Sequence, residues 1–198
     1  MIICLTKAVK TLEVQRMVNW IAGKLGLKSE TQMDTEYLEC IRELAEHKKV
    51  LSMRNYMQHK KIDCLEHSLH VSYYSYFLCR KLGLDWRAAS RGGLLHDFFL
   101  YDWHNKDRKD RKGLHGFTHP KIALRNAKLY FNISDMEEDI ICKHMWPLTI
   151  KLPRYKESYI VVFVDKYCAF TETCDWGRRD SMKKRLFEQS DINLNIFI

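Results

Sequence analysis

Residues 92–102 read GGLLHDFFLYD, an apolar stretch that contains an adjacent histidine and aspartate, His96 and Asp97. Burying an imidazole and a carboxylate without partners costs several kcal/mol, because both lose their hydration. A divalent metal ion bound by both side chains would remove that cost. The alternative is a hydrogen-bonded core histidine beside an aspartate at a helix end, so the choice depends on the rest of the chain.

Helical patterns lie on both sides of this stretch. Apolar residues at a spacing of three and four, with capping residues and glycines at the ends, predict helices over residues 6–25, 34–57, 64–82, 86–96, 118–130, 134–144 and 157–174. Ser134 and Glu137 form a capping box, and Pro147 marks the break after the sixth helix. The polar segment 104–113 is expected to be a surface loop. The sequence therefore predicts an all-α fold.

The composition fits one compact helical domain over residues 1–198. Gly and Pro are scarce, at 8 and 3 residues, which favours helices over a turn-rich β fold. We expect a helical extension over residues 1–60 and the core of the functional site over residues 64–170. Seven cysteines without a CxxC pair indicate reduced thiols, each a small buried apolar side chain, rather than a disulfide framework.

The chain carries no predicted membrane segment. No stretch approaches the ~20 apolar residues that span a bilayer, and the N-terminus lacks the basic and apolar regions of a signal peptide. We therefore expect a cytoplasmic protein. The net charge of +8 permits an anionic partner, but it does not choose between nucleic acid and a phosphorylated small molecule.

Side chains of the type that bind metals recur along the predicted helices. A charged residue inside an apolar run, as Asp165 is in IVVFVDKYCAF, is rarely buried without a partner. Imidazole and carboxylate groups suit iron, manganese, zinc, cobalt or nickel and do not make a thiolate-type structural zinc site. The candidate ligands, in chain order, are His67, His96, Asp97, His119, His144 and Asp165.

The motifs around these residues resemble the HD-domain metal-dependent phosphohydrolase superfamily. They are EHSLHV at 66–71, LLHD at 94–97, HGFTH at 115–119, ICKH at 141–144 and VDK at 164–166. The resemblance implies the HD-domain fold and one metal ion held by His67, His96, Asp97 and Asp165. His119 and His144 match two further histidines that hold a second ion in some members, with Asp97 bridging the two ions as the catalytic carboxylate.

The resemblance implies hydrolysis of a phosphate mono- or diester by a metal-activated water at a centre of two ions. We expect a phosphorylated small molecule, nucleotides included, as substrate rather than nucleic acid. Many members have a lysine soon after the doublet, whereas here an aromatic segment intervenes. Contacts to the substrate are therefore expected from Lys106, Arg111 and His115.

Two other functions stay open from the sequence. Some proteins with the HD fold and the same six ligands are di-iron oxygenases that use dioxygen. The second is a non-catalytic module that binds nucleotides or signals, with a structural metal. His70 lies one helical turn after His67, and the match to the family's motif favours His67 as the ligand.

Overall fold

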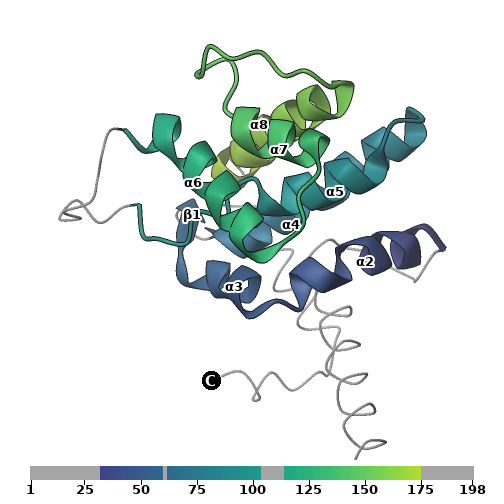
Figure 1. Ribbon diagram of the computed structural model, residues 1–198, viewed down its shortest axis with the longest axis horizontal. Coiled ribbons are helices and arrows are strands. Elements are labelled where there is room, and N and C mark those ends of the chain that lie inside the picture. Colours follow the sequence, from purple (N-terminus) through teal and green to yellow (C-terminus); the bar gives the residue numbers. More distant parts are fainter. Residues whose placement is uncertain (1–31, 60–61, 104–113, 175–198) are drawn as a thin grey trace, which may run out of the picture.

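The structure, a computed structural model, describes residues 32–59, 62–103 and 114–174 (Figure 1). Helices dominate these residues, and the two short strands form one antiparallel pair, so the predicted all-α class is confirmed. The elements are α2 (Gln32–Ala45), α3 (Lys48–Leu51), the 3-10 helix η1 (Ser52–Asn55), β1 (Met57–His59), β2 (Ile62–Asp63), α4 (Cys64–Lys81), α5 (Trp86–Leu95), α6 (His115–Tyr130), α7 (Asp135–Lys143) and α8 (Lys156–Cys174).

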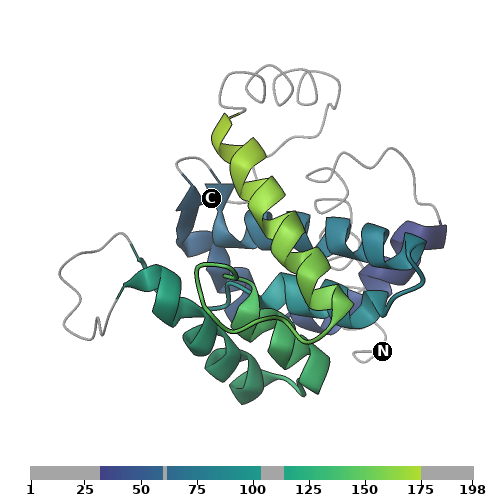
Figure 2. The same ribbon diagram turned by 90° about the horizontal axis from the view of Figure 1, so that it is seen from above.

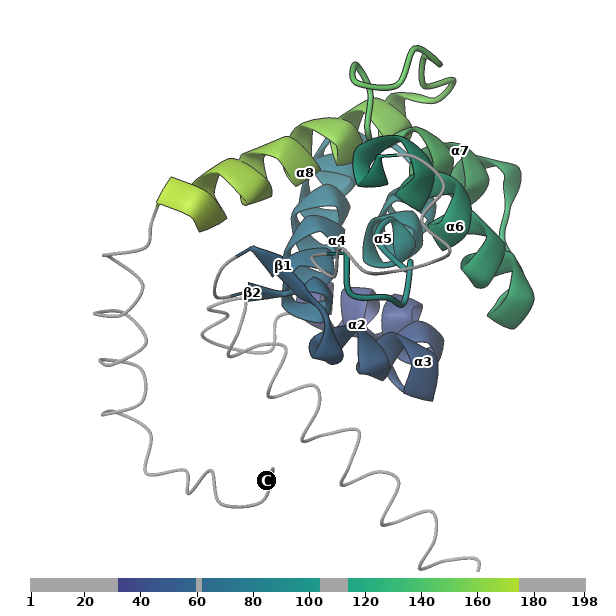
Figure 3. The same ribbon diagram turned by 90° about the vertical axis from the view of Figure 1, so that its left-hand side faces the viewer.

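Helices α4 and α5 form the centre of the fold. Figures 1 and 3 show α7 and α8 on one side of this pair and α2 and α3 on the other. Helix α8 runs obliquely across α4 (Figure 2), and α6 lies against α7. This arrangement directs residues of α4, α5, α6, α7 and α8 toward one region at the C-terminal end of α5.

Two glycines allow the central helices to approach each other closely. A Cβ atom at Gly93 of α5 would lie 3.1 Å from the Cα atom of Ser72 in α4. A Cβ atom at Gly92 would lie 2.8 Å from the Cγ2 atom of Ile140 in α7. Because a side chain at either position would push a neighbouring helix away, these glycines fix where the end of α5 lies.

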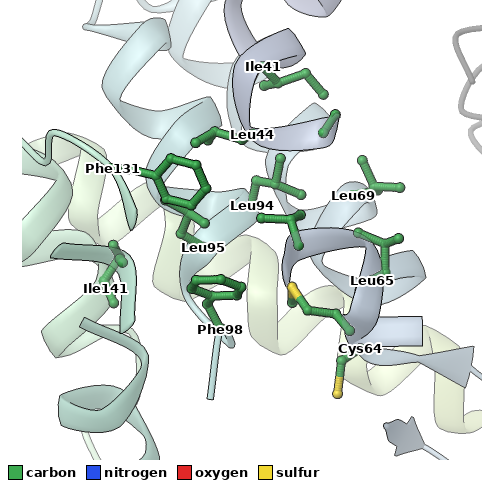
Figure 4. Packing of buried hydrophobic residues seen from close by; sticks show 14 of the residues in the cluster. Ile41, Leu44, Cys64, Leu65, Leu69, Leu94, Leu95, Phe98, Phe131 and Ile141 are labelled. Atoms are coloured by element: carbon green, nitrogen blue, oxygen red, sulfur yellow. The ribbon is translucent and has the colours of Figure 1, made fainter. Parts of the chain in front are cut away.

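The apolar residues around the doublet belong to the main core. Leu94, Leu95 and Phe98 are fully buried and pack with side chains from α2 and α4 and with Phe131 and Ile141 (Figure 4). Burial of each large apolar side chain contributes roughly 1.5–3 kcal/mol. Phe98 and the buried Phe99 follow the doublet directly, so the same packing that stabilises the fold holds His96 and Asp97 in the interior.

The predicted continuous helix over residues 34–57 is wrong. Helix α2 ends at Ala45, His47 caps the short helix α3 by accepting a hydrogen bond from the Lys49 amide, and the chain then enters η1 and β1. The reason is that the apolar residues after Ala45 no longer fall on the helix face that α2 buries. Continuing α2 would direct Lys48 and Lys49 into the core, whereas the observed break exposes them and buries Val50.

The later helices match their predicted ranges closely. Helices α4, α5 and α7 begin and end within a few residues of the expected positions, α8 begins within one residue of its expected start, and α6 begins three residues early, at His115. The capping box of Ser134 and Glu137 is confirmed. The Trp146–Pro147 peptide bond is cis and lies in the connection before α8. The predicted helix over residues 6–25 and the predicted loop over residues 104–113 lie outside the described residues.

Among the described helices, none combines the length and the apolar character needed to cross a membrane. The cysteines within the described ranges, apart from the side chain of Cys174, are free thiols. Cys64, Cys79 and Cys168 are buried, as expected of small apolar side chains, whereas Cys40 and Cys142 are partly exposed.

Candidate metal centre

The structure brings the six predicted ligands together in the interior. Each belongs to, or directly follows, one of five helices that meet at the end of α5, and each is at most 7% exposed. They are His67 of α4, His96 and Asp97 at the end of α5, His119 of α6, His144 at the end of α7 and Asp165 of α8.

One set of these side chains, His67, His96 and Asp165, is called here the first group. Each contributes a ligand atom, and these atoms lie within 4.8 Å of one another. Asp165 Oδ1 lies 3.2 Å from His67 Nε2 and 3.7 Å from His96 Nε2. The other oxygen of Asp165 accepts a hydrogen bond of 2.8 Å from Lys166 Nζ, which leaves Oδ1 directed at the two imidazoles. The first group can therefore hold a metal ion.

A second set, the second group, consists of Asp97, His119 and His144. Asp97 Oδ1 lies 3.2 Å from His119 Nε2 and 3.5 Å from His144 Nε2. The other oxygen, Oδ2, lies 3.4 Å from Nε2 of His96. His96, Asp97 and His144 also have ligand atoms within 4.8 Å of one another. The two oxygens of Asp97 thus face different groups.

Hydrogen bonds to backbone carbonyls fix the tautomer of three histidines. Nδ1 of His96 lies 2.7 Å from the Gly93 carbonyl, Nδ1 of His119 lies 2.8 Å from the His115 carbonyl, and Nδ1 of His144 lies 2.9 Å from the Ile141 carbonyl. A carbonyl oxygen only accepts, so each Nδ1 carries hydrogen and each neutral ring directs the Nε2 lone pair to the centre. This is the orientation of metal-binding histidines.

The contact between His119 and His144 points to a cation. Their Nε2 atoms are 2.8 Å apart, so two neutral rings of this tautomer would place lone pairs against each other. A proton or a metal ion between the nitrogens removes the repulsion. Two nitrogens bound to one ion at about 2.0–2.1 Å lie about 3 Å apart when they occupy neighbouring positions. The observed spacing suits that arrangement.

Two atoms of the doublet are buried without a hydrogen bond in the part of the chain that the structure describes. They are Nε2 of His96 and Oδ1 of Asp97. Buried polar atoms in proteins are nearly always paired, because an unpaired one retains its desolvation cost. A metal ion would accept lone pairs from both atoms. The residues present therefore fit a metal site.

Protons partly replace such an ion when none is bound. Burial opposes charge on His67, but the hydrogen bonds that its ring donates to the carboxylates of Asp165 and Glu172 outweigh burial and raise the pKa of His67 to about 9. For His96, burial is outweighed by Asp97 and Asp165, and the pKa rises to about 10. Burial of Asp97 and Asp165 acts to raise their pKa values, but the neighbouring histidines outweigh it and hold both pKa values well below the usual range.

His144 shows the opposite shift. Burial, together with electrostatic repulsion from the neighbouring rings of His119 and His96, lowers the pKa of His144 to about 3. A ring that resists protonation keeps its Nε2 lone pair at neutral pH. It can therefore bind a metal ion without first losing a proton.

Two side chains that contact the ligands were missed by the sequence analysis. Gln58 of β1 donates a hydrogen bond of 2.5 Å to Asp97 Oδ2. Glu172 of α8 lies 2.8 Å from His67 Nδ1, and its other oxygen lies 3.1 Å from His70 Nδ1. The sequence signal for Glu172 was its position two helical turns after Asp165. No signal pointed to Gln58, because no strand was predicted here and the helix predicted over residues 34–57 ended just before it.

The expected contacts to the substrate are only partly described. His115 is half-buried beside the second group: its ring stacks on His119 at 4.5 Å and on Trp103 at 5.0 Å. The Tyr101 hydroxyl lies 3.0 Å from His115 Nδ1. Lys106 and Arg111 lie outside the described residues, so their predicted role stays a prediction.

Comparisons with known proteins return no family model, no curated protein and no solved structure that matches this chain.

Proposed function

We propose that the chain is an HD-domain metal-dependent phosphohydrolase with two metal ions. The observation that supports this most is the position of Asp97, whose two carboxylate oxygens face different histidines. A carboxylate in that position can bridge two ions, with the first group on one side and the second group on the other. Fe, Mn, Zn, Co or Ni suits the donor set.

Two such ions, when bound, would lower the pKa of a coordinated water toward neutrality and neutralise charge on phosphoryl oxygens. The protein then supplies orientation. Asp97 holds its Oδ1 toward His119 and His144 while Gln58 fixes Oδ2 through a hydrogen bond. Lys166 Nζ donates hydrogen bonds to Oδ2 of Asp165 and to the backbone carbonyl of His144. This lysine therefore connects a residue of the first group with a residue of the second.

His115 is the described residue best placed to contact the phosphate ester. Its stacking between Trp103 and His119 fixes the plane of the ring beside the second group. The hydroxyl of Tyr101 near Nδ1 fixes the orientation of the ring within that plane. In this proposal, His115 donates a hydrogen bond to a phosphoryl oxygen or a proton to the leaving group.

The test is hydrolysis of a panel of phosphate mono- and diesters, nucleotides included, by protein loaded separately with Mn²⁺, Fe²⁺, Zn²⁺, Co²⁺ or Ni²⁺. We expect turnover of at least one ester and its loss in Asp97→Asn. Asp139→Asn is the matched control: Asp139 is a buried carboxylate of α7 that bonds Ser158 and the Arg154 amide instead of the candidate ligands. It should keep the activity.

The same panel separates the two other functions. Oxygen consumption by the iron-loaded protein, with no ester hydrolysed under any metal, would replace the proposal with an oxygenase. Tight binding of a nucleotide without turnover would replace it with a binding module.

A further inference from the structure

His67 differs from the other three histidines of the centre in the partner of its Nδ1 atom. His96, His119 and His144 bond a carbonyl three or four residues earlier in their own helix. His67 instead faces a carboxylate of α8, 105 residues later in the chain. A negatively charged partner binds the ring more strongly than a carbonyl and makes the opposite nitrogen a better donor to a cation.

The carboxylate in question, Glu172, is held on both oxygens. Oε2 lies 2.8 Å from His67 Nδ1, Oε1 lies 3.1 Å from His70 Nδ1, and the carboxylate side chain is fully buried. His67 and His70 are one turn apart on α4, and Asp165 and Glu172 are two turns apart on α8, so each pair lies on one helix face. Helix α8 therefore contacts both nitrogens of His67: Asp165 at Nε2 and Glu172 at Nδ1.

We infer that Glu172 is a positioning residue for the first group, and that His70 holds Glu172 in place. This inference rests on the metal centre of the proposed function. In this arrangement Glu172 keeps the proton of His67 on Nδ1 and fixes the ring plane. Nε2 is thereby directed toward Asp165 Oδ1 and His96.

The expected effect is selective. Removing a hydrogen-bond partner of a metal-binding histidine typically weakens metal affinity about 10–100-fold. Glu172→Ala should produce a loss of this size at the first group and leave the second group nearly unchanged. Glu172→Gln retains an oxygen that accepts from Nδ1 and should lose less. His70→Ala acts only through Glu172, so a smaller loss is expected.

The experiment measures Mn²⁺ binding from the free-ion electron paramagnetic resonance signal, with no substrate present. Each variant is prepared in the full chain and again with His119→Ala, which disables the second group so that the first is measured alone. Glu157→Ala is the matched control: Glu157 is also a buried carboxylate of α8, but it accepts a hydrogen bond from the Asp85 amide instead of a candidate ligand. Thermal unfolding is recorded for every protein.

The result expected is weaker Mn²⁺ binding in the order Glu172→Ala, Glu172→Gln, His70→Ala, with Glu157→Ala equal to wild type. Equal affinity in Glu172→Ala and wild type overturns the inference while leaving the proposed function intact. An equal loss in Glu172→Ala and Glu157→Ala also overturns it, because α8 packing would then explain both. If the wild type binds no Mn²⁺, the inference and the metal centre fail together. If metal binds but no ester is hydrolysed, only the proposed function fails.

Discussion

The affinity of the first group for Mn²⁺ should rise about a thousandfold between about pH 6.5 and about pH 8. The pKa values of His67 and His96 are raised to about 9 and about 10, so both rings are protonated at neutral pH when no ion is bound. An ion that binds Nε2 of both rings must displace two protons. Each displaced proton contributes about tenfold in affinity per pH unit below its pKa.

Ordinary histidines would behave very differently. With a pKa of about 6.5, two rings are already half-deprotonated at the start of this range, and the same pH change would strengthen binding only about fourfold. Asp97 and Asp165 add nothing here, because their pKa values lie well below the usual range. The size of the pH effect therefore reports directly on the two raised pKa values.

The assay is Mn²⁺ titration of the His119→Ala protein at several pH values, with proton release counted in parallel by pH-stat. About two protons should be released for each ion bound near pH 7. An affinity that changes less than tenfold over the range, or release of fewer than about one proton per ion, would refute the reasoning.

Two further predictions concern stability. In urea unfolding, Gly93→Ala should destabilise the fold by about 1–3 kcal/mol, because the added Cβ atom would contact the Ser72 backbone. The same variant should weaken metal binding, because the Gly93 carbonyl accepts a hydrogen bond from His96. Gly83→Ala is the control, since φ is +66° there and the space is open: it should lose about 1 kcal/mol of stability and bind metal as the wild type does. With a chelator present, the free energy of unfolding should fall as the pH rises from about 6.5 toward 9–10, because only the folded protein retains protons on His67 and His96 in that window. Mn²⁺ should reduce this alkaline loss, and urea midpoints that follow the same pH profile with and without the ion would contradict the prediction.

Much of the fold could be predicted because its signals are local. Ser134 and Glu137 cap α7, and Gly83 follows the end of α4, so the bounds of these two helices were placed closely. The break after α2 has no glycine or proline. Its only signal is that Lys48 and Lys49 fall where the apolar phase of α2 expects buried residues. Such a change in the spacing of apolar residues is a weak signal for a helix end when the residues on both sides favour helix.

Gln58 shows why part of the site escaped prediction. It lies on a strand of three residues whose partner has two, and so short a pair carries no alternating apolar pattern. The strand pairs with β2, which leads directly into α4, and the Gln58 amide reaches Asp97, 39 residues later in the chain. Its place in the site follows from tertiary packing, which a local pattern does not encode.

The His-Asp doublet could be identified because it combines a helix end with a ligand pair. Consecutive residues inside a helix point about 100° apart, so they cannot both face one centre. His96 is the C-terminal cap of α5, and Asp97 lies beyond it, where the turn brings its Oδ2 to 3.4 Å from His96 Nε2. Helix ends also leave carbonyls without a partner in the last turn, and His96 uses one of them, at Gly93, to orient its ring.

His144 repeats this arrangement at the end of α7, where Nδ1 bonds the Ile141 carbonyl. Both histidines therefore carry their orienting partner within four residues, and a sequence motif is enough to specify them. His67 depends on Glu172, more than a hundred residues away, so the motif that identifies His67 contains no trace of the residue that orients it. The first group should accordingly be the more sensitive of the two to changes in how α8 packs on α4.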